Sequence, residues 1–288
     1  MKHELFPFAG KFFSLRGGHR LHYLDEGQGE LVVMVHGNPT WSFYYRNLVL
    51  ALRATHRVIV PDHIGMGLSD KPPDSRYSYV LQSRIDDLDA LLAAVAPGVR
   101  VTLILHDWGG MIGMGWAARH PELVSRIVLL NTAAFHLPPH MRVPLSLTAV
   151  RSLGGVFVRG FNGFARGAAW VGCKRRRLPA DLRDAYCEPY DSWTNRIATL
   201  RFVQDIPLQP SDASFSLVSS IEAALPGFRA TPVLICWGDQ DFVFTPAVLG
   251  EWVARWPQAQ VHRFADCGHY VLEDAGSEIE ALVRGFLA

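Results

Sequence analysis

Short runs of valine, isoleucine and leucine recur along the chain, and each run is too short to form a helix of ordinary length. Each run is followed within two residues by Gly, Asp or Asn. Strands that are buried on both faces of a parallel sheet have this pattern. We therefore predict strands over residues 31–35, 57–60, 101–105, 127–130 and 232–237.

Helical patterns lie between the predicted strands. In residues 81–95, leucine and isoleucine recur at helix spacing, and charged residues fill positions between them. Ahead of the strands, residues 11–15 and 19–24 are predicted to form an antiparallel hairpin that turns at Gly17 and Gly18. Alternating strands and helices predict an α/β fold with a mostly parallel, doubly wound sheet.

The alternation lapses from about residue 135 to residue 228, where proline, arginine, glycine and aromatic residues replace it. Helical stretches are predicted there around residues 145–159 and 181–190, and a buried-strand pattern resumes at Pro232. This order predicts a helical cap inserted into the core. The predicted division is a core of residues 1–134 and 229–288 and a cap of residues 135–228.

The composition disfavours several classes of protein. Lys and Arg number 28 and Asp and Glu number 27, so the net charge of +1 disfavours nucleic acid as a partner, and the basic run at residues 174–177 is read as solvated cap surface. No run approaches the ~18 apolar residues that a membrane span requires. The four cysteines lack metal-binding or disulfide spacing, and residues 1–13 lack the features of a signal peptide. We expect a cytoplasmic protein with no metal and no other cofactor.

The most informative segment is residues 101–113, where a buried strand runs into a glycine-rich sharp turn and then a helix. This is the context of a nucleophile elbow, in which small residues let the turn close and expose the central side chain. Asp107 holds the central position, and its carboxylate can attack carbon to form an ester without prior deprotonation. Leu105 departs from the usual Gly two residues earlier. The alternative for Asp107 is an N-cap that opens a core helix.

A second motif, His-Gly-Asn-Pro-Thr-Trp at residues 36–41, follows the first predicted parallel strand. An α/β hydrolase places there the loop that completes its oxyanion hole. Asn38 supplies an amide donor, and the indole N–H of Trp108, next to the nucleophile, supplies another. Two neutral donors suit a leaving group that departs as an anion and needs no proton. The alternative is a structural Asn turn and a core Trp.

The candidate base and acid lie near the C-terminus. Residues 260–270 form a predicted strand that ends in a Gly-His loop, so His269 is the candidate base. An acid should orient this imidazole and stabilise its charge. Asp241 is favoured for this role, and Asp239, which lies nearer the strand and is read as a turn residue, is the second candidate. The chain order is then nucleophile, acid and base, as in α/β hydrolases.

These motifs together resemble the haloalkane dehalogenase branch of the α/β-hydrolase superfamily, over nearly the whole chain. The resemblance includes the His-Asp-Trp-Gly-Gly elbow, Pro-Asp with Gly-x-Gly-x-Ser-Asp-Lys-Pro at residues 61–72, and Cys-Gly-His at residues 267–269. Some relatives take their acid from the end of the preceding strand, but the matching position here is Asn131, which cannot hold a charge. The resemblance implies the following roles: nucleophile Asp107, base His269, acid Asp241, and anion-binding pair Asn38 and Trp108.

A closer resemblance exists to the β-lactone decarboxylases of bacterial long-chain olefin biosynthesis, through residues 41–48, 191–208 and 264–270. It implies decarboxylation of long-chain cis-β-lactones to cis-alkenes and carbon dioxide, and assembly with other enzymes of the same pathway. Hydrolysis of 1-haloalkanes to alcohol and halide is the alternative that uses the same residues. Attack at the alkyl carbon and attack at the lactone carbonyl both stay open.

The cap offers candidates for substrate binding. Residues 154–171 are apolar, aromatic and rich in glycine, which favours a hydrophobic substrate with long alkyl chains. Ordinary packing of the cap on the core is the alternative. The candidate substrate-binding residues are Phe157, Phe161, Phe164 and Trp170.

Two other functions are open. Epoxide hydrolases share the Asp elbow but activate the epoxide with acidic cap tyrosines, for which the cap contains Tyr186 and Tyr190. An inactive hydrolase fold that serves as a binding module would normally lack a member of the triad. This sequence contains a candidate for each member, so we expect an enzyme.

Overall fold

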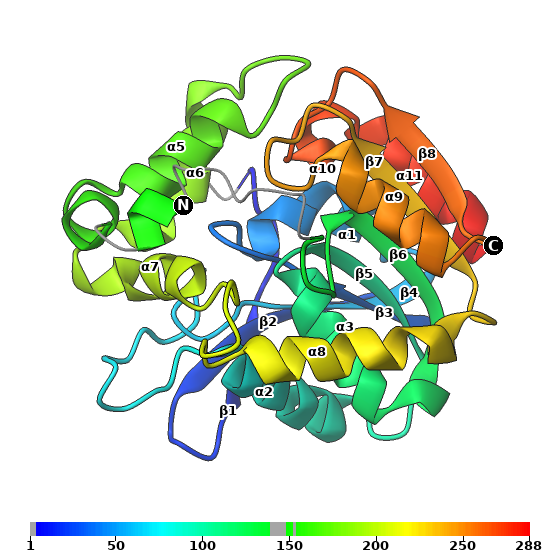
Figure 1. Cartoon of the computed structure of the whole chain (residues 1–288), viewed down its shortest axis with the longest axis horizontal. Coiled ribbons are helices and arrows are strands. Elements are labelled where there is room, and N and C mark those ends of the chain that lie inside the picture. Colours follow the sequence, from blue (N-terminus) through cyan, green and yellow to red (C-terminus); the bar gives the residue numbers. More distant parts are fainter. Residues whose placement is uncertain (1–3, 139–147, 152–153) are drawn as a thin grey trace.

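The computed structural model describes residues 4–138, 148–151 and 154–288. Within these residues, the centre of the molecule is an eight-stranded sheet with the order β1-β2-β4-β3-β5-β6-β7-β8 (Figure 1). β1 and β2 form an antiparallel hairpin, β2 pairs antiparallel with β4, and the remaining neighbours pair in parallel. The strands are β1 (Lys11–Ser14), β2 (Arg20–Glu26), β3 (Glu30–Val35), β4 (His56–Pro61), β5 (Val101–Asp107), β6 (Val124–Thr132), β7 (Val233–Gly238) and β8 (Gln260–Phe264).

Helices cover both faces of the sheet (Figure 1). Short 3-10 helices and one π-helical turn, Val156–Gly160, join them. The α-helices of the described residues include α1 (Arg46–Leu52), α2 (Leu81–Val95), α3 (Gly109–Arg119), α5 (Gly163–Val171), α6 (Ala180–Cys187), α7 (Ile197–Gln204), α8 (Phe215–Ala224), α9 (Pro246–Arg255), α10 (Val271–Asp274) and α11 (Gly276–Leu287).

The hydrophobic core has two parts, one on each face of the sheet. Successive side chains of a strand point to opposite faces, so Val33 and Val35 of β3 join one part while Val32 and Met34 join the other. The first part packs under α2, α3, α8 and α9, and the second under α1, α10 and α11. Burial on both faces explains why the parallel strands appear in the sequence as unbroken apolar runs.

The predicted fold class is confirmed, and so are the hairpin, the five parallel strands and the helix over residues 81–95. Strand ends differ by up to three residues. β6, for example, begins at Val124 and includes Ser125 and Arg126, because backbone pairing with β5 continues past the apolar run. Of the helix predicted around residues 145–159, residues 145–147 and 152–153 lie outside the described part of the chain.

The predicted cap corresponds to residues between β6 and β7. α5, α6 and α7 lie together beside the sheet, whereas α8 lies along the core near α2 and α3 (Figure 1). Ile221 of α8 approaches Gly115 of α3, and both Val218 and Ile221 belong to the core under that face. The last helix of the predicted cap is therefore packed on the core. None of the helices in the described residues has the length and apolar character needed to span a bilayer.

Candidate active site

Asp107 ends β5 in a strained turn. Its φ of 52° lies in the left-handed region, which non-glycine residues adopt rarely and which is typical of a nucleophile elbow. α3 begins two residues later. The departure at Leu105 is accommodated by Gly113 of α3, since a Cβ at that glycine would collide with the Leu105 side chain. The elbow therefore closes with a large residue at the position that usually carries glycine.

His269 lies between two carboxylates. Its Nε2 is 3.4 Å from Asp107 Oδ2, and its Nδ1 is 2.8 Å from Asp241 Oδ2. All three residues are buried. Burial disfavours a charged imidazole, but Asp241 and Asp107 outweigh burial and raise the pKa of His269 to about 10. Burial also works to raise the pKa of Asp107, but the neighbouring His269 dominates and lowers it. The two carboxylates therefore favour a protonated imidazole in the resting site.

The two candidate acids have different surroundings. Asp241 accepts the Val243 N–H at 2.7 Å with its other oxygen, so its carboxylate is aimed at the imidazole. Asp239 instead forms a surface ion pair with Arg263, at 3.0 Å. The structure thus brings Asp241 to His269 and leaves Asp239 outside the site.

Asn131, which cannot itself hold the charge of an acid, contacts the predicted acid. It lies near the end of β6 with a φ of 37°, and its Nδ2 donates to Asp241 Oδ2 at 3.0 Å and to the Gly238 carbonyl at 3.0 Å. Its Oδ1 accepts the Gly238 N–H at 2.8 Å. Asn131 therefore does not supply the negative charge itself, but its amide holds the Asp241 carboxylate in place. The available signal was its place at the end of a strand beside the elbow.

Asn38 and Trp108 both line the cavity together with Asp107 and His269. The Asn38 backbone N–H donates to Asp107 Oδ1 at 2.7 Å, and its side-chain Nδ2 donates to the Thr199 carbonyl at 3.1 Å. The second hydrogen of the Asn38 side-chain amide remains available for another acceptor. Trp108 follows Asp107 directly and keeps part of its side chain open to the cavity. Both side chains can therefore donate to an anion beside Asp107.

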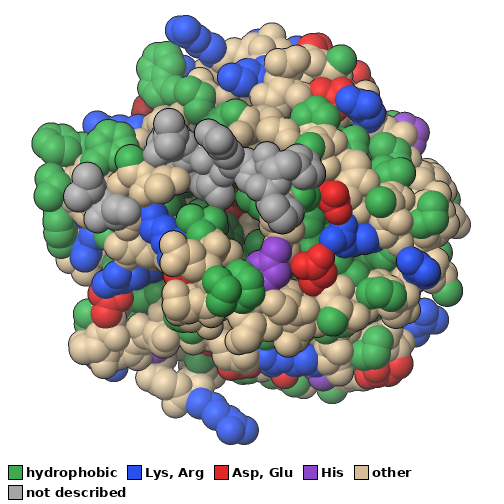
Figure 2. Space-filling model, viewed as in Figure 1, with side chains coloured by type: hydrophobic (Ala, Val, Ile, Leu, Met, Phe, Trp, Pro, Cys, Tyr) green, Lys and Arg blue, Asp and Glu red, His purple; other side chains and the backbone are tan. Residues whose placement is uncertain are grey.

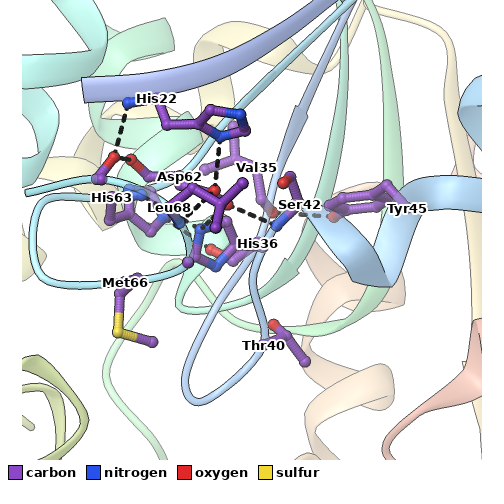
Figure 3. A network of polar contacts seen from close by, with 12 residues as sticks. His22, Val35, His36, Thr40, Ser42, Tyr45, Asp62, His63, Met66 and Leu68 are labelled. Atoms are coloured by element: carbon purple, nitrogen blue, oxygen red, sulfur yellow. Dashed lines mark hydrogen bonds and ion pairs between the residues drawn. The ribbon is translucent and has the colours of Figure 1, made fainter. Parts of the chain in front are cut away.

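A buried polar network supports the loop that carries Asn38 (Figure 3). Asp62, at the end of β4, accepts hydrogen bonds from His22 Nδ1 at 2.8 Å, from the Ser42 N–H at 2.6 Å and from the Leu68 N–H at 2.9 Å. Burial opposes ionisation, but His22 outweighs it, so the pKa of Asp62 falls to about 2. A buried, ionised Asp62 thus joins three segments of chain around the loop.

Two histidines connect this network to the loop itself. His36 accepts the His63 N–H on Nε2 at 3.3 Å and has Nδ1 2.9 Å from the Gly37 carbonyl. His63 Nε2 lies 2.9 Å from the His36 carbonyl. Burial lowers the pKa of both imidazoles, so both are neutral. The loop that carries Asn38 is therefore held by hydrogen bonds among residues that do not line the cavity.

A cavity of about 1220 Å³ lies over these residues, larger than the usual range for small-molecule sites. Its walls are mainly apolar, and on the cap side they include Phe157 and Phe164. Phe161 and Trp170 are not among the described residues that line it, so the structure brings two of the four predicted substrate-binding residues to the cavity. Hydrophobic side chains are visible on the outside of the molecule over the cap (Figure 2).

The helix geometry explains this difference. Phe164, Ala168 and Val171 follow helical spacing on α5 and all line the cavity, which turns Trp170 outward onto Arg183, 4.2 Å from its ring centre. Phe161 is separated from α5 by Asn162, whose φ of 54° breaks the helix. Phe157, Phe161 and Phe164 have the spacing of one helical face, but they do not share a face because the helix is broken at Asn162.

The cap tyrosines do not reach the cavity. The Tyr186 hydroxyl donates to Glu273 at 2.5 Å, and the Tyr190 hydroxyl lies 3.7 Å from the Met66 sulfur. Neither is among the described residues that line the cavity. This arrangement does not favour epoxide activation. The described residues also contain no cluster of His, Cys, Asp and Glu that could hold a metal ion.

The α/β hydrolase fold family matches residues 30–276, so the chain belongs to the α/β hydrolases. Within them it belongs with the haloalkane dehalogenases and their decarboxylase relatives. It is 58% identical to a cis-3-alkyl-4-alkyloxetan-2-one decarboxylase of Shewanella oneidensis, over 100% of this chain and 91% of the relative. A protein of the same name from Xanthomonas campestris pv. campestris is 48% identical, over 100% and 98%.

More distant relatives are dehalogenases. Haloalkane dehalogenase 2 of Mycobacterium tuberculosis is 30% identical, over 97% of this chain and 95% of the relative. The crystal structure of the haloalkane dehalogenase DatA from Agrobacterium tumefaciens matches with a TM-score of 0.83 at 25% identity, over 97% and 96%. The predicted resemblance to both groups is confirmed, and the chain belongs to a family of enzymes.

Proposed function

We propose that this enzyme decarboxylates cis-β-lactones with long alkyl chains to cis-alkenes and carbon dioxide. The observation that carries the proposal is a buried carboxylate, Asp107, facing two neutral donors at the base of a large apolar cavity. Two relatives at 58% and 48% identity are named for decarboxylation of a 3,4-dialkyl β-lactone. A substrate with two alkyl groups suits a cavity whose apolar walls extend along both the cap and the core.

The proposed reaction begins with attack of Asp107 on the alkyl carbon of the lactone ring that is bonded to the ring oxygen. That bond breaks and leaves its electron pair on the carboxylate, which Asn38 and Trp108 stabilise. The carbon inverts and becomes bonded to Asp107 as an ester. Loss of carbon dioxide then supplies the electrons for the new double bond and expels the Asp107 carboxylate, so no water is consumed. Anti elimination after inversion gives a cis-alkene. Attack at the lactone carbonyl is the second route.

His269 has a defined role in this scheme. Formation of the ester removes the charge of Asp107, and with it one of the two carboxylates that keep His269 protonated. In the second step, the remaining imidazolium stabilises the carboxylate as it leaves. In a dehalogenase the same residue instead activates water, which hydrolyses the ester. The fate of the ester therefore distinguishes the two functions.

The test is to supply a long-chain cis-β-lactone, a 1-haloalkane and an epoxide to the purified enzyme and to measure alkene, halide and diol. We expect alkene from the lactone, with little halide and no diol. His269→Ala should still release alkene from the lactone, more slowly. Rapid halide release without alkene formation would reject the decarboxylase in favour of a dehalogenase.

Haloalkane hydrolysis is the second candidate, because the more distant relatives and the matching crystal structure are haloalkane dehalogenases. In that case, His269→Ala should stop after one turnover. Asp107 would then carry the alkyl group as added mass on the elbow peptide, visible by mass spectrometry. Absence of this adduct with a haloalkane, alongside alkene from the lactone, supports the decarboxylase.

Location and partners are also part of the proposal. The four cysteines are free, which suits a reducing cytoplasm. We infer a hydrophobic small-molecule substrate, no cofactor, and assembly with other enzymes of the same pathway. Co-purification of the tagged enzyme from cells with the enzyme that forms the β-lactone would support assembly, and recovery of the enzyme alone would contradict it.

A further inference from the structure

A buried arginine lies behind the proposed leaving-anion site. Arg84, on α2, has a fully buried side chain, and its guanidinium carbon lies 3.7 Å from the centre of the Phe202 ring and 5.7 Å from the Trp108 ring. Phe202 meets Trp108 edge to face, with ring centres 5.4 Å apart. A positive charge therefore lies next to the aromatic pair whose Trp108 member lines the cavity.

The charge of Arg84 is only partly compensated. Its Nη1 donates to Asp205 Oδ2 at 3.0 Å, but its buried Nε and Nη2 have no hydrogen-bond partner among the described residues. Asp205 is shared with two other donors, the Leu81 N–H and the Ser214 hydroxyl, both at 2.7 Å. Arginine stays protonated in proteins, and buried donors without partners are rare. The guanidinium therefore pairs with Asp205 on one side only, and its Nε and Nη2 donors meet no acceptor among the described residues.

The cap helix α7 joins this charge to both proposed anion donors. Thr199 of α7 accepts a hydrogen bond from the Asn38 side chain, and Phe202 of the same helix packs on Trp108. Asp205 follows the last residue of α7 and binds Arg84. One short helix thus sets the positions of the amide donor, the indole donor and the cation relative to one another.

We propose that Arg84 is a positioning residue of the leaving-anion site, and that its buried charge raises the affinity of Asn38 and Trp108 for anions. This inference rests on the proposed function and deepens it. When the lactone C–O bond breaks, negative charge appears on the carboxylate beside Trp108. A cation behind the indole stabilises that charge without touching the substrate or transferring a proton.

Anion affinity tests the proposal without any turnover. Bromide and acetate are titrated against tryptophan fluorescence of the full-length protein, with Trp108→Phe to identify the part of the signal that belongs to Trp108. Arg84→Met removes the charge and should weaken anion binding roughly ten-fold, whereas Arg84→Lys should lose less than about three-fold. Arg126→Met is the matched control, since Arg126 pairs with Glu30 on the surface and should leave the affinity unchanged.

Asp205→Asn separates an electrostatic role from a merely structural one. The amide oxygen can still accept the Leu81 N–H, but the counter-charge of Arg84 is gone, so anion affinity should rise or stay equal. If the ion pair only held the fold together, Arg84→Met and Asp205→Asn would both weaken anion binding, and that result would overturn the proposal. So would wild-type affinity in Arg84→Met. If Arg84→Met does not fold, the anion affinity of Asp205→Asn is the test, and weaker anion binding in that variant contradicts the proposal.

Turnover of a cis-β-lactone separates this inference from the proposed function. Arg84→Met should lower kcat roughly ten-fold while KM changes less, because the charge acts on the anion that forms in the transition state. An unreactive lactone together with the expected loss of bromide affinity would reject the decarboxylase and keep the role of Arg84. Normal lactone turnover and normal anion affinity in Arg84→Met would reject the role of Arg84 alone.

Discussion

The two walls of the cavity are built differently. On the core side, Asp107 ends β5, Asp241 and His269 follow β7 and β8, and His269 contacts the two carboxylates at 3.4 and 2.8 Å. On the cap side, Phe157 and Phe164 present apolar surface without directional contacts. We therefore expect the core wall to set which bond is attacked and the cap wall to set which substrates fit beside it.

α7 is the exception to this division. It belongs to the cap segment, yet its Thr199 carbonyl binds Asn38 and its Phe202 ring packs on Trp108. The proposed anion donors therefore depend on both walls. Substitutions on the core wall should change the chemical step, whereas substitutions on the cap wall should change the choice of substrate.

The largest expected effect is on the core wall, at the nucleophile. Asp107→Asn should retain the fold and lose roughly 10³- to 10⁶-fold in kcat, because an amide cannot attack as a carboxylate. Steady-state rates and mass spectrometry of the purified variant provide the measurement, with mass spectrometry also excluding deamidation back to Asp. Wild-type rates in the intact amide would mean that another residue is the nucleophile.

The next effect separates the two neighbouring aspartates after β7. Asp241→Asn should lower kcat by roughly 10²- to 10⁴-fold, because the amide no longer stabilises the imidazolium. Asp239→Asn removes only a surface ion pair with Arg263 and should stay within about two-fold of wild type. Rates of the two variants are compared under identical conditions. The opposite ranking would assign the acid to Asp239.

The free energy of unfolding of the protein should depend on pH through the ionisation of His269 on the core wall. Its folded-state pKa is raised to about 10, above the ~6.5 of a free histidine, so the ion pairs contribute fully below about pH 6.5 and are lost as pH rises through about 10. Unfolding by urea from pH 6 to 10 should show a decline of a few kcal/mol that is smaller in His269→Gln. Equal slopes in both proteins would contradict a protonated His269.

The smallest effect is expected on the cap wall. Phe164→Ala should enlarge the cavity and raise KM for long-chain substrates by roughly three- to ten-fold with little change in kcat, since it removes apolar contact and no catalytic group. Phe161→Ala, the matched control on the exposed surface, should leave both constants unchanged. A change in chain-length preference with Phe161→Ala alone would place that side chain against the substrate.

Much of the core could be predicted from the sequence because its signals are local. Each buried strand is one short apolar run, and the elbow is a continuous strand, turn and helix over residues 101–113. The roles of Asp107 and His269 were proposed from such local patterns. Local patterns alone could not decide between Asp239 and Asp241, because both follow the same strand. Only the path of the loop decides which carboxylate reaches the imidazole.

The cap shows where local patterns fail. Phe157, Phe161 and Phe164 have the spacing of one helical face, but the left-handed Asn162 interrupts the helix and turns Phe161 outward. A backbone break of this kind has no strong signal in side-chain hydrophobicity. The sequence therefore indicated an apolar cap without showing which of its aromatic residues face the cavity.

By itself, the sequence determined the fold and the family, and it predicted the order of the proposed catalytic residues. Only the tertiary structure placed the Asn131 amide on the Asp241 carboxylate, 110 residues away along the chain. It also placed Arg84 behind Trp108, 24 residues away. Hydrophobic periodicity records which side chains are buried, because burial is set by the local alternation of each element. It does not record which buried polar groups meet, because that depends on how distant elements pack against one another.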